Sequence, residues 1–184
     1  MKLDFPPHFL WGTSTASAQI ETATDHAWRG VKAKDGYIFE RTTDHELRQD
    51  EDIELICTLG NVYRCGVDWA WLQNAPNAPF NKAAIVHYQG FFEDLEARNV
   101  KIMFVFHHFT NPNWFEAMCG FEKKENIAYF LNYVEQCITH FGVYMYAFNT
   151  FNGLYFQENI VFKCLYWKSS SLIHDLIQRI LLNC

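Results

Sequence analysis

The chain has 184 residues, of which 49% are apolar, and this is enough to bury the core of one domain of ordinary size. Its formal charge is −6 and its lysines and arginines form no basic stripe, which argues against nucleic-acid binding. No stretch reaches the length of about 18 apolar residues that a membrane span needs, and the first residues lack the hydrophobic segment of a signal peptide. We therefore expect a cytoplasmic protein with neither a nucleic-acid nor a membrane partner.

The cysteines and histidines give little indication of a metal site. Six cysteines are scattered without a Cys-x-x-Cys pair, and in a reducing compartment we expect them to be free thiols. His107 and His108 form the one suggestive cluster, but adjacent residues of a strand point to opposite faces. Gly12 stands alone before Thr13, so the sequence lacks a glycine-rich phosphate loop. We expect neither a metal ion nor any other cofactor.

Four apolar segments predict strands, and three amphipathic segments between them predict helices. The strands are expected at residues 9–11, 61–67, 101–106 and 143–151, and the third is the nearly continuous apolar run typical of a buried parallel strand. The helices are expected at residues 44–59, after an Asn81 cap, and at residues 127–141, where Gly60 ends the first helix in the C′ role and Gly142 ends the third. The apolar stripe of the second helix comprises Ala84, Ile85, Tyr88, Phe92 and Leu95.

This alternation of strands and helices predicts βαβ units and a parallel sheet, which is an α/β fold. Four such units are too few to close an eight-stranded barrel, which takes about 250 residues. An open, doubly wound sheet is the alternative topology. In either architecture, ligands bind where the carboxyl ends of the strands converge.

Polar residues gather at or just beyond these predicted strand ends. Each alone is more often structural than functional, since an arginine in a strand commonly forms an ion pair and a buried histidine is commonly satisfied in the core. Their joint position at one edge of the sheet favours a binding site. The residues concerned are Gln19, Glu21, Arg64, Asp68, His107, His108, Asn149 and Asn152.

Five ordered segments resemble glycoside hydrolase family 1, which comprises β-glucosidase and β-galactosidase type enzymes on a (β/α)₈ barrel. They are Phe9–Glu21, Asp44–Gly60, Tyr63–Trp69, Phe106–Trp114 and Thr150–Asn152, so the resemblance covers residues 5–152. It implies the amino-terminal half of a TIM barrel, with four βα units in residues 1–152. It also implies the activity of a retaining glycosidase in carbohydrate metabolism, which hydrolyses the O-glycosyl bond of a β-linked sugar.

The resemblance assigns roles to individual residues. Gln19, His108 and Asn152 match the residues that hydrogen-bond the sugar at the cleavage subsite, where Asn152 would hold the 2-OH. Arg64 matches the arginine that pairs with the catalytic nucleophile. We expect Trp114 to pack the loop after the third strand rather than to stack on a sugar.

The chain departs from the family where catalysis would occur. Retaining glycosidases need two carboxyl groups about 5–5.5 Å apart. Gly153 occupies the position of the acid/base glutamate, and the strand that carries the nucleophile lies beyond the matched segments. Glu158 follows five residues after Gly153, but nothing directs it to the site. We expect no hydrolysis by this chain alone, and the alternatives are a non-catalytic, weakly sugar-binding protein or an interaction protein.

Residues 153–184 no longer resemble the family, as a frameshift, a truncated gene or a spliced product would explain. Residues 171–183 predict an amphipathic helix that covers the outer face of the last strand or, alternatively, docks a partner. A half-barrel would also leave its first and fourth strands as open edges, from which we expect self-association. The apolar stripe of this helix consists of Leu172, Ile173, Leu176, Ile177, Ile180 and Leu181.

Overall fold

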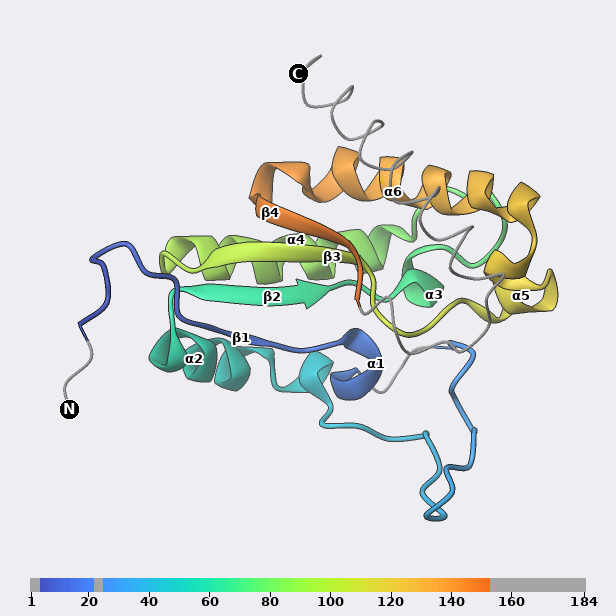
Figure 1. Cartoon of the computed structure of the whole chain (residues 1–184), viewed down its shortest axis with the longest axis horizontal. Coiled ribbons are helices and arrows are strands. Elements are labelled where there is room, and N and C mark those ends of the chain that lie inside the picture. Colours follow the sequence, from blue (N-terminus) through green and yellow to red (C-terminus); the bar gives the residue numbers. More distant parts are fainter. Residues whose placement is uncertain (1–3, 22–24, 153–184) are drawn as a thin grey trace.

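The computed structural model describes residues 4–21 and 25–152, which form a parallel four-stranded sheet with helices packed against it (Figure 1). The strands are β1 (Gly12–Ser14), β2 (Val62–Gly66), β3 (Lys101–His107) and β4 (Met145–Phe151), and their order in the sheet is their order in the chain. Each neighbouring pair is parallel. The predicted α/β class with a parallel sheet is confirmed.

Three long helices connect the strands, as the stripes predicted. They are α2 (Gln49–Leu59), α4 (Lys82–Ala97) and α6 (Ile127–Phe141), and α4 contacts both α2 and α6. The Asn81 side chain accepts a hydrogen bond from the Ala83 N–H at 2.9 Å, which confirms the predicted cap of α4. The shorter helices are α1 (Ser17–Ile20), α3 (Trp69–Leu72) and α5 (Asn113–Ala117), with 3₁₀ turns at His45–Leu47, Gly120–Glu122, Lys124–Asn126 and Gly142–Tyr144.

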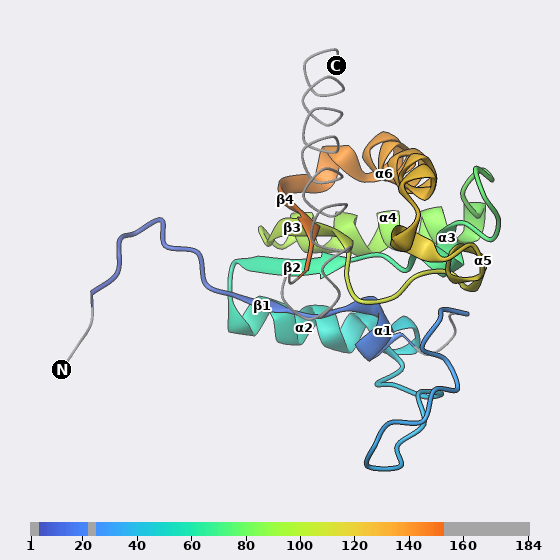
Figure 2. The ribbon, with the colours of Figure 1, turned by 45° about the vertical axis from the view of Figure 1, so that its right-hand side comes forward.

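Some predicted boundaries were wrong. β1 begins at Gly12 rather than at Phe9, because Phe9 and Trp11 pack with Phe5 in an exposed aromatic cluster with ring centroids 4.7 Å apart. These amino-terminal residues extend away from the sheet (Figure 2). The first long helix begins at Gln49 rather than at Asp44, whose left-handed backbone (φ 57°) precedes a 3₁₀ turn. β4 begins at Met145, after another such turn.

Gly60 does follow the last residue of α2, but not in the left-handed conformation expected of a C′ glycine. Its φ of 176° is extended, and its N–H donates to the Ile56 carbonyl at 3.2 Å. Glycine is required because a Cβ at this position would lie 2.1 Å from the carbonyl oxygen of Trp11. The residue therefore permits the close approach of the chain before β1 to the start of β2.

The helices cover one face of the sheet through a continuous apolar core. Phe92 of α4, Phe104 of β3 and Phe141 of α6 are fully buried, with the Phe92 ring 6.0 Å from the ring of Phe104 and 5.7 Å from the ring of Phe141. Every member of the predicted α4 stripe is buried except Ile85, which is partly buried. The periodic residues thus decide which face of the sheet the helices cover.

The register places different residues on the opposite face. Paired residues of parallel strands point to the same side, and one such row runs across the sheet as Ser14, Arg64, Met103 and Ala147. The adjacent row on the helix side contains Cys65, Phe104 and Phe148. Arg64 therefore lies on the face of the sheet that the three long helices do not cover.

Candidate functional site

The carboxyl ends of the four strands meet along one edge of the sheet, as a parallel sheet requires. Two backbone hydrogen bonds connect the segments that leave the strands. The Thr15 N–H donates to the Arg64 carbonyl at 3.1 Å, and the Asn152 N–H donates to the His107 carbonyl at 2.9 Å. These bonds hold the end of β1 beside β2 and the end of β4 beside β3, so the residues at this edge have fixed relative positions.

Arg64 connects three strands through its side chain. Its Nη2 donates to Oδ1 of Asn152 at 2.8 Å, and its Nη1 donates to Oγ of Ser14 at 3.1 Å. Since β3 lies between β2 and β4, the bond to Asn152 passes over β3 on the face that the long helices leave uncovered. The structure thus joins two of the residues that the sequence assigned to one site.

These two bonds leave hydrogen-bonding capacity for a ligand. A guanidinium has five N–H donors, and the contacts to Ser14 and Asn152 use two of them. Asn152 accepts from Arg64 through Oδ1, which leaves the two donors of its Nδ2 amide. A hydroxyl-rich ligand at this edge would therefore meet several directed donors.

His108 follows β3 and is buried beside this pair. Burial, together with the positive charge of Arg64 and the proximity of His107, lowers the pKa of His108 to about 4. The imidazole is therefore neutral at pH 7. Its buried Nδ1 has no hydrogen-bond partner among residues 4–21 and 25–152. An unpaired buried nitrogen is costly unless a ligand satisfies it, so the atom itself indicates a binding site.

Gln19 occupies the exposed side of the single-turn helix α1. The neighbouring Ala16, Ser17 and Ala18 are buried and anchor this turn, and the Gln19 N–H donates to the Ala16 carbonyl at 2.9 Å. The structure does not bring the Gln19 side chain into a hydrogen bond with Arg64, His108 or Asn152. Its predicted role in sugar binding stays a prediction.

Glu21 and Asp68 are not at the open edge, where the sequence placed them, but beneath it. Glu21 is only 4% exposed, and its Oε2 accepts a hydrogen bond of 2.6 Å from the Tyr88 hydroxyl. The Tyr88 hydroxyl in turn accepts from the backbone N–H of Asp68 at 2.9 Å. Burial, together with the negative charge of Asp68, raises the pKa of Glu21 to about 8.

The sequence pattern does not reveal this buried network, because Tyr88 falls on the apolar stripe of α4. A tyrosine on a core stripe carries a hydroxyl that needs a partner, and this is the signal that could have revealed the network. Because its pKa is about 8, Glu21 is a neutral carboxylic acid at pH 7, buried below the edge of the sheet.

His107 and Trp114 support the loop after β3. His107 contacts the rings of Phe121 and Phe130, and it shares a hydrogen bond of 2.9 Å between its Nε2 and Oδ1 of Asn111. Trp114 donates from Nε1 to the Gln73 carbonyl at 2.9 Å. The ring of Trp114 packs edge-on against Trp69, which confirms that it packs the loop.

The described part of the chain contains neither a cluster of metal ligands nor a membrane-spanning helix. Within it, no three His, Cys, Asp or Glu side chains are close enough together to hold a metal ion. No helix there is long and apolar enough to cross a membrane. Gly153, Glu158 and the predicted helix at 171–183 lie outside the described residues.

Comparison with known proteins identifies the family to which this site belongs. The sequence profile of glycosyl hydrolase family 1 matches residues 1–168, which is most of the chain. The chain belongs to glycosyl hydrolase family 1. Beta-glucosidase A of Enterobacter agglomerans is 30% identical over 154 residues, which cover 76% of this chain and 32% of that protein.

Solved structures of family 1 enzymes superpose on the described fold. A β-glycosidase from Pyrococcus horikoshii is 31% identical with a TM-score of 0.74, and covers 84% of this chain and 37% of its own. A family 1 β-glucosidase from Thermotoga maritima is 25% identical with a TM-score of 0.76, and covers 82% and 37% respectively. The chain therefore spans about a third of the length of these relatives, and the predicted partial TIM barrel is confirmed.

Proposed function

We propose that this chain forms the sugar-binding part of a β-glycosidase site, and that Gln19, His108 and Asn152 hold a β-linked sugar. The observation that carries the proposal is the hydrogen bond between Arg64 and Asn152 beside the unpaired Nδ1 of His108. Sugar hydroxyls both donate and accept, and they suit a site that combines amide groups with a neutral imidazole. Arg64 would stabilise an ionised nucleophile carboxylate in a complete site.

The chain alone is not expected to hydrolyse a glycoside. Arg64 contacts Asn152 and Ser14 rather than a carboxylate, and the sequence has Gly153 at the position of the acid/base glutamate. The buried Glu21 is bonded to Tyr88. The family's reaction, hydrolysis of β-glycosides in carbohydrate metabolism, would need two carboxyl groups placed on opposite sides of the glycosidic bond.

An activity assay and a binding assay test separately the expected lack of hydrolysis and the expected binding of a sugar. Purified chain and a Gly153→Glu variant should both fail to release aryl alcohol from an aryl β-glucoside. Hydrolysis by the unaltered chain would overturn this part of the proposal. Binding of methyl β-glucoside in the millimolar range, weakened by Asn152→Ala, would support the sugar site.

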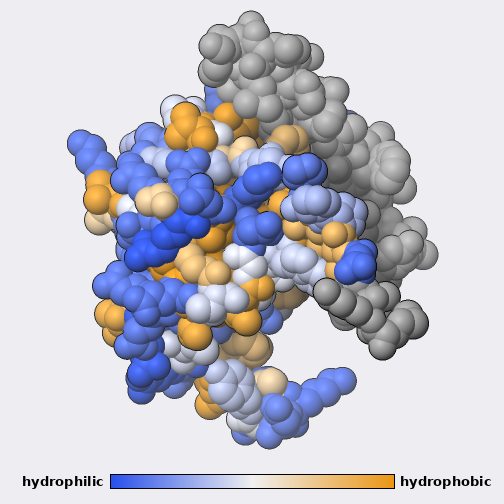
Figure 3. All heavy atoms as spheres, turned by 90° about the vertical axis from the view of Figure 1, so that its left-hand side faces the viewer, coloured by the Kyte–Doolittle hydropathy of each residue, from blue (hydrophilic) through white to orange (hydrophobic). Residues whose placement is uncertain are grey.

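A second proposal concerns self-association. Among the described residues β1 pairs only with β2 and β4 only with β3, so each leaves one edge without a strand. Beside β4, a cavity of about 340 Å³ is lined by residues that include Phe106, Ile138 and Phe148. At the amino-terminal ends of the strands, hydrophobic patches lie between hydrophilic ones (Figure 3). We expect dimers or larger species, and a single monomeric species in sedimentation velocity would contradict this.

The cytoplasm is the proposed location. Cys57, Cys65, Cys119 and Cys137 are free thiols, and burial raises the pKa of Cys65 and Cys137, which keeps both unreactive. Free thiols at these positions suit a reducing compartment. Fluorescence microscopy of a tagged chain would test the location, and secretion of the chain would contradict it.

A further inference from the structure

The short helix α1 cannot hold its own position. It has four residues (Ser17–Ile20), which make a single turn, and no side chain caps its amino end at Ala16. A helix of this length is unstable in isolation, because it does not recover the cost of nucleation. The direction in which Gln19 points is therefore set by the contacts that hold α1 from outside.

The residue before α1 is bonded to β2. The Thr15 N–H donates to the Arg64 carbonyl, and the Thr15 hydroxyl shares a hydrogen bond with the hydroxyl of Tyr63. Tyr63 is buried in the core, so this end of the turn is fixed to the sheet. A single bonded end still leaves the turn free to pivot about Thr15, and Gln19 lies four residues further along the chain.

The other end of α1 is bonded to the helix layer through Glu21. The Glu21 N–H donates to the Ser17 carbonyl at 2.8 Å, which closes the turn, and Oε2 of Glu21 accepts the hydrogen bond of 2.6 Å from the Tyr88 hydroxyl. The Tyr88 hydroxyl also accepts from the N–H of Asp68, the residue that caps α3. One buried hydroxyl of α4 therefore connects the end of α1 with the start of α3.

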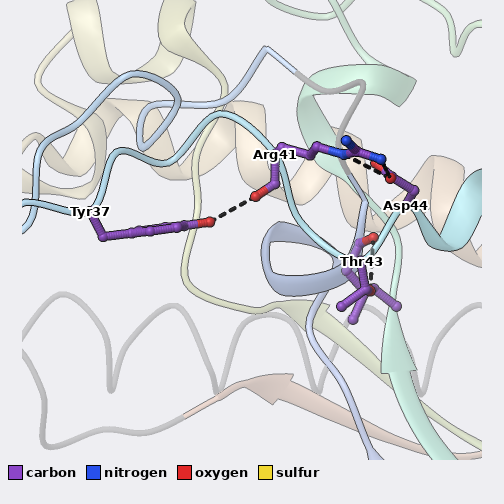
Figure 4. A network of polar contacts seen from close by, with 5 residues as sticks. Tyr37, Arg41, Thr43 and Asp44 are labelled. Atoms are coloured by element: carbon purple, nitrogen blue, oxygen red, sulfur yellow. Dashed lines mark hydrogen bonds and ion pairs between the residues drawn. The ribbon is translucent and has the colours of Figure 1, made fainter.

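A second contact at this end of α1 is weaker. The Thr43 hydroxyl donates to the Ile20 carbonyl at 3.4 Å in an exposed position, which is longer than an ordinary O–H···O bond (Figure 4). Arg41 pairs with Asp44 at 2.6 Å beside it. Because a long, exposed hydrogen bond contributes little, Glu21 is the stronger anchor of the two.

The packing beneath α1 is incomplete. A cavity of about 10 Å³, which has room for one water molecule, lies between α1, α2 and α4, and Ile20 and Glu21 are among the residues that line it. Gln49 and His87 line it from the long helices, and their buried Nε2 atoms have no hydrogen-bond partner in residues 4–21 and 25–152. Part of α1 thus rests over a polar cavity rather than on closely packed side chains, so the turn has room to shift when the Glu21 bond is lost.

The groups that face Glu21 oppose its ionisation. Burial, together with the negative charge of Asp68, raises the pKa of Glu21 to about 8, so at pH 7 its bond to Tyr88 joins two neutral groups. Ionisation favours positions in which the carboxylate reaches water and therefore acts against the buried position. The titratable side chains around Glu21 are His45 and Glu46 of the 3₁₀ turn, Tyr63 and Cys65 of β2, Asp68, His87 and Tyr88 of α4, and Tyr133 of α6.

We propose that Glu21 is a positioning residue of the sugar site, whose hydrogen bond to Tyr88 holds α1 so that Gln19 faces the carboxyl edge of the sheet. The inference rests on the proposed function, because it assumes that Gln19 contacts the sugar together with His108 and Asn152. Glu21 is buried and acts through Gln19 rather than on the sugar. Breaking the bond, by substitution or by removal of the proton, releases α1 and weakens sugar binding.

Tyr88→Phe is the first test, because it removes the hydroxyl and keeps the buried ring. NMR titration with methyl β-glucoside at pH 7 should show binding about three- to tenfold weaker than in the unaltered chain, as expected for the loss of one buried hydrogen bond. Hydrogen exchange measured by mass spectrometry should be faster in residues 15–21. Tyr133→Phe is the matched control, since it removes a similarly buried hydroxyl of α6 that makes no hydrogen bond to α1, and it should leave both measurements unchanged.

A double substitution tests whether the effect passes through Gln19. Gln19→Ala alone should weaken the binding of methyl β-glucoside. Adding Tyr88→Phe to Gln19→Ala should cause no further loss, because both substitutions then remove the same contact with the sugar. A purely structural role of Tyr88 would instead make the two losses additive.

The pH dependence of binding tests Glu21 itself. In the unaltered chain the affinity for methyl β-glucoside should fall several-fold as the pH rises from 7 to 9, because Glu21 loses its proton in this range. Glu21→Gln keeps an acceptor oxygen for Tyr88 but has no such proton. This variant should bind as the unaltered chain does at pH 7 and retain that affinity at pH 9.

The outcomes separate the inference from the proposed function. Unchanged affinity in Tyr88→Phe, or additive losses in the double variant, would overturn the inference and leave the sugar site standing. A pH dependence that persists in Glu21→Gln would also overturn it, and this comparison decides if Tyr88→Phe does not fold. Failure of every form to bind methyl β-glucoside would reject the proposed sugar site and the role of Glu21 with it.

Discussion

The two faces of the sheet differ in the burial and polarity of their side chains. On the helix side, residues such as Phe92 and Phe104 are fully buried and contact other rings of the core. On the other side and at the carboxyl edge, Arg64 and Asn152 are only partly buried, and His108 keeps an unpaired nitrogen. The first set stabilises the fold, while the second retains hydrogen-bonding capacity at some cost in stability. Substitutions on the two sides should therefore affect different measurements.

The largest effect is expected from Phe92→Ala on the helix side. Removing a fully buried ring that packs against Phe104 and Phe141 should lower the free energy of unfolding by about 3–5 kcal/mol. Val86→Ala on the same helix is the control, since Val86 is 69% exposed and its truncation should change stability by no more than about 0.5 kcal/mol. Urea denaturation would measure both, and equal losses would contradict the assignment of the core.

Gly60→Ala should have the next largest effect. The added Cβ would lie 2.1 Å from the Trp11 carbonyl oxygen, so the chain before β1 must move, at an expected cost of about 1–3 kcal/mol. Gly90→Ala is a matched control within α4, because its added Cβ would meet no atom within 4 Å apart from those of its chain neighbours and its own helix backbone. That variant should gain about 0.5–1 kcal/mol from helix propensity. Destabilisation by both would show that the contact with Trp11 is not the cause.

Glu21→Gln should change how stability depends on pH. The pKa of Glu21 is about 8 in the folded chain against 4.5 for an unperturbed glutamate. Between these values the unfolded chain has released a proton that the folded chain still holds, so stability falls as the pH rises. Conversely, burial lowers the pKa of His107 and His108 to about 4, and stability falls as the pH drops from 6.5 toward 4.

The free energy of unfolding should therefore be greatest near pH 6.5, which thermal or urea unfolding across pH would show. Glu21→Gln should remove the decline from pH 6.5 to 8. This decline amounts to about 1–2 kcal/mol in the free energy of unfolding, because a single proton is involved. The same substitution at the exposed Glu122 should leave the profile unchanged. A decline that persists in Glu21→Gln would locate its cause elsewhere.

Asn152→Ala should have the smallest effect on stability and a clear effect on binding. It removes one partly exposed hydrogen bond to Arg64, worth about 1 kcal/mol, but it also removes the amide donors offered to the sugar. We expect a small shift in denaturation midpoint and several-fold weaker binding of methyl β-glucoside. Loss of stability comparable to that of Phe92→Ala would erase the distinction between the two faces.

The helix side was largely predictable from the sequence. The stripe of α4 and its Asn81 cap were correct because 3.6-residue periodicity and capping are local properties. β1 was placed three residues early because the aromatic run at Phe9 and Trp11 resembles a buried strand, whereas it forms a separate exposed cluster. Local sequence does not distinguish an aromatic residue in a buried strand from one in an exposed aromatic cluster.

Within the site, only the residues at strand ends or in segments that resemble the family could be predicted from the sequence. Arg64 and Asn152 lie at the ends of strands, and the resemblance linked them although they are 88 positions apart. Glu21 was misplaced because its partner is a hydroxyl on an apolar stripe, and the contact of Thr43 with Ile20 was not predicted because Thr43 lies in an irregular loop. Contacts made by irregular loops carry no periodicity from which to infer them.

The agreement between strand order and chain order has a consequence for synthesis. Each βα unit packs against the unit that has just preceded it, so the contacts within this sheet involve comparatively short loops of chain. Such a topology has a low contact order for a parallel sheet and can assemble progressively from its amino terminus. On the ribosome, β1 and β2 would pair as soon as β2 has emerged after α2, and each later strand would add to the strands already paired.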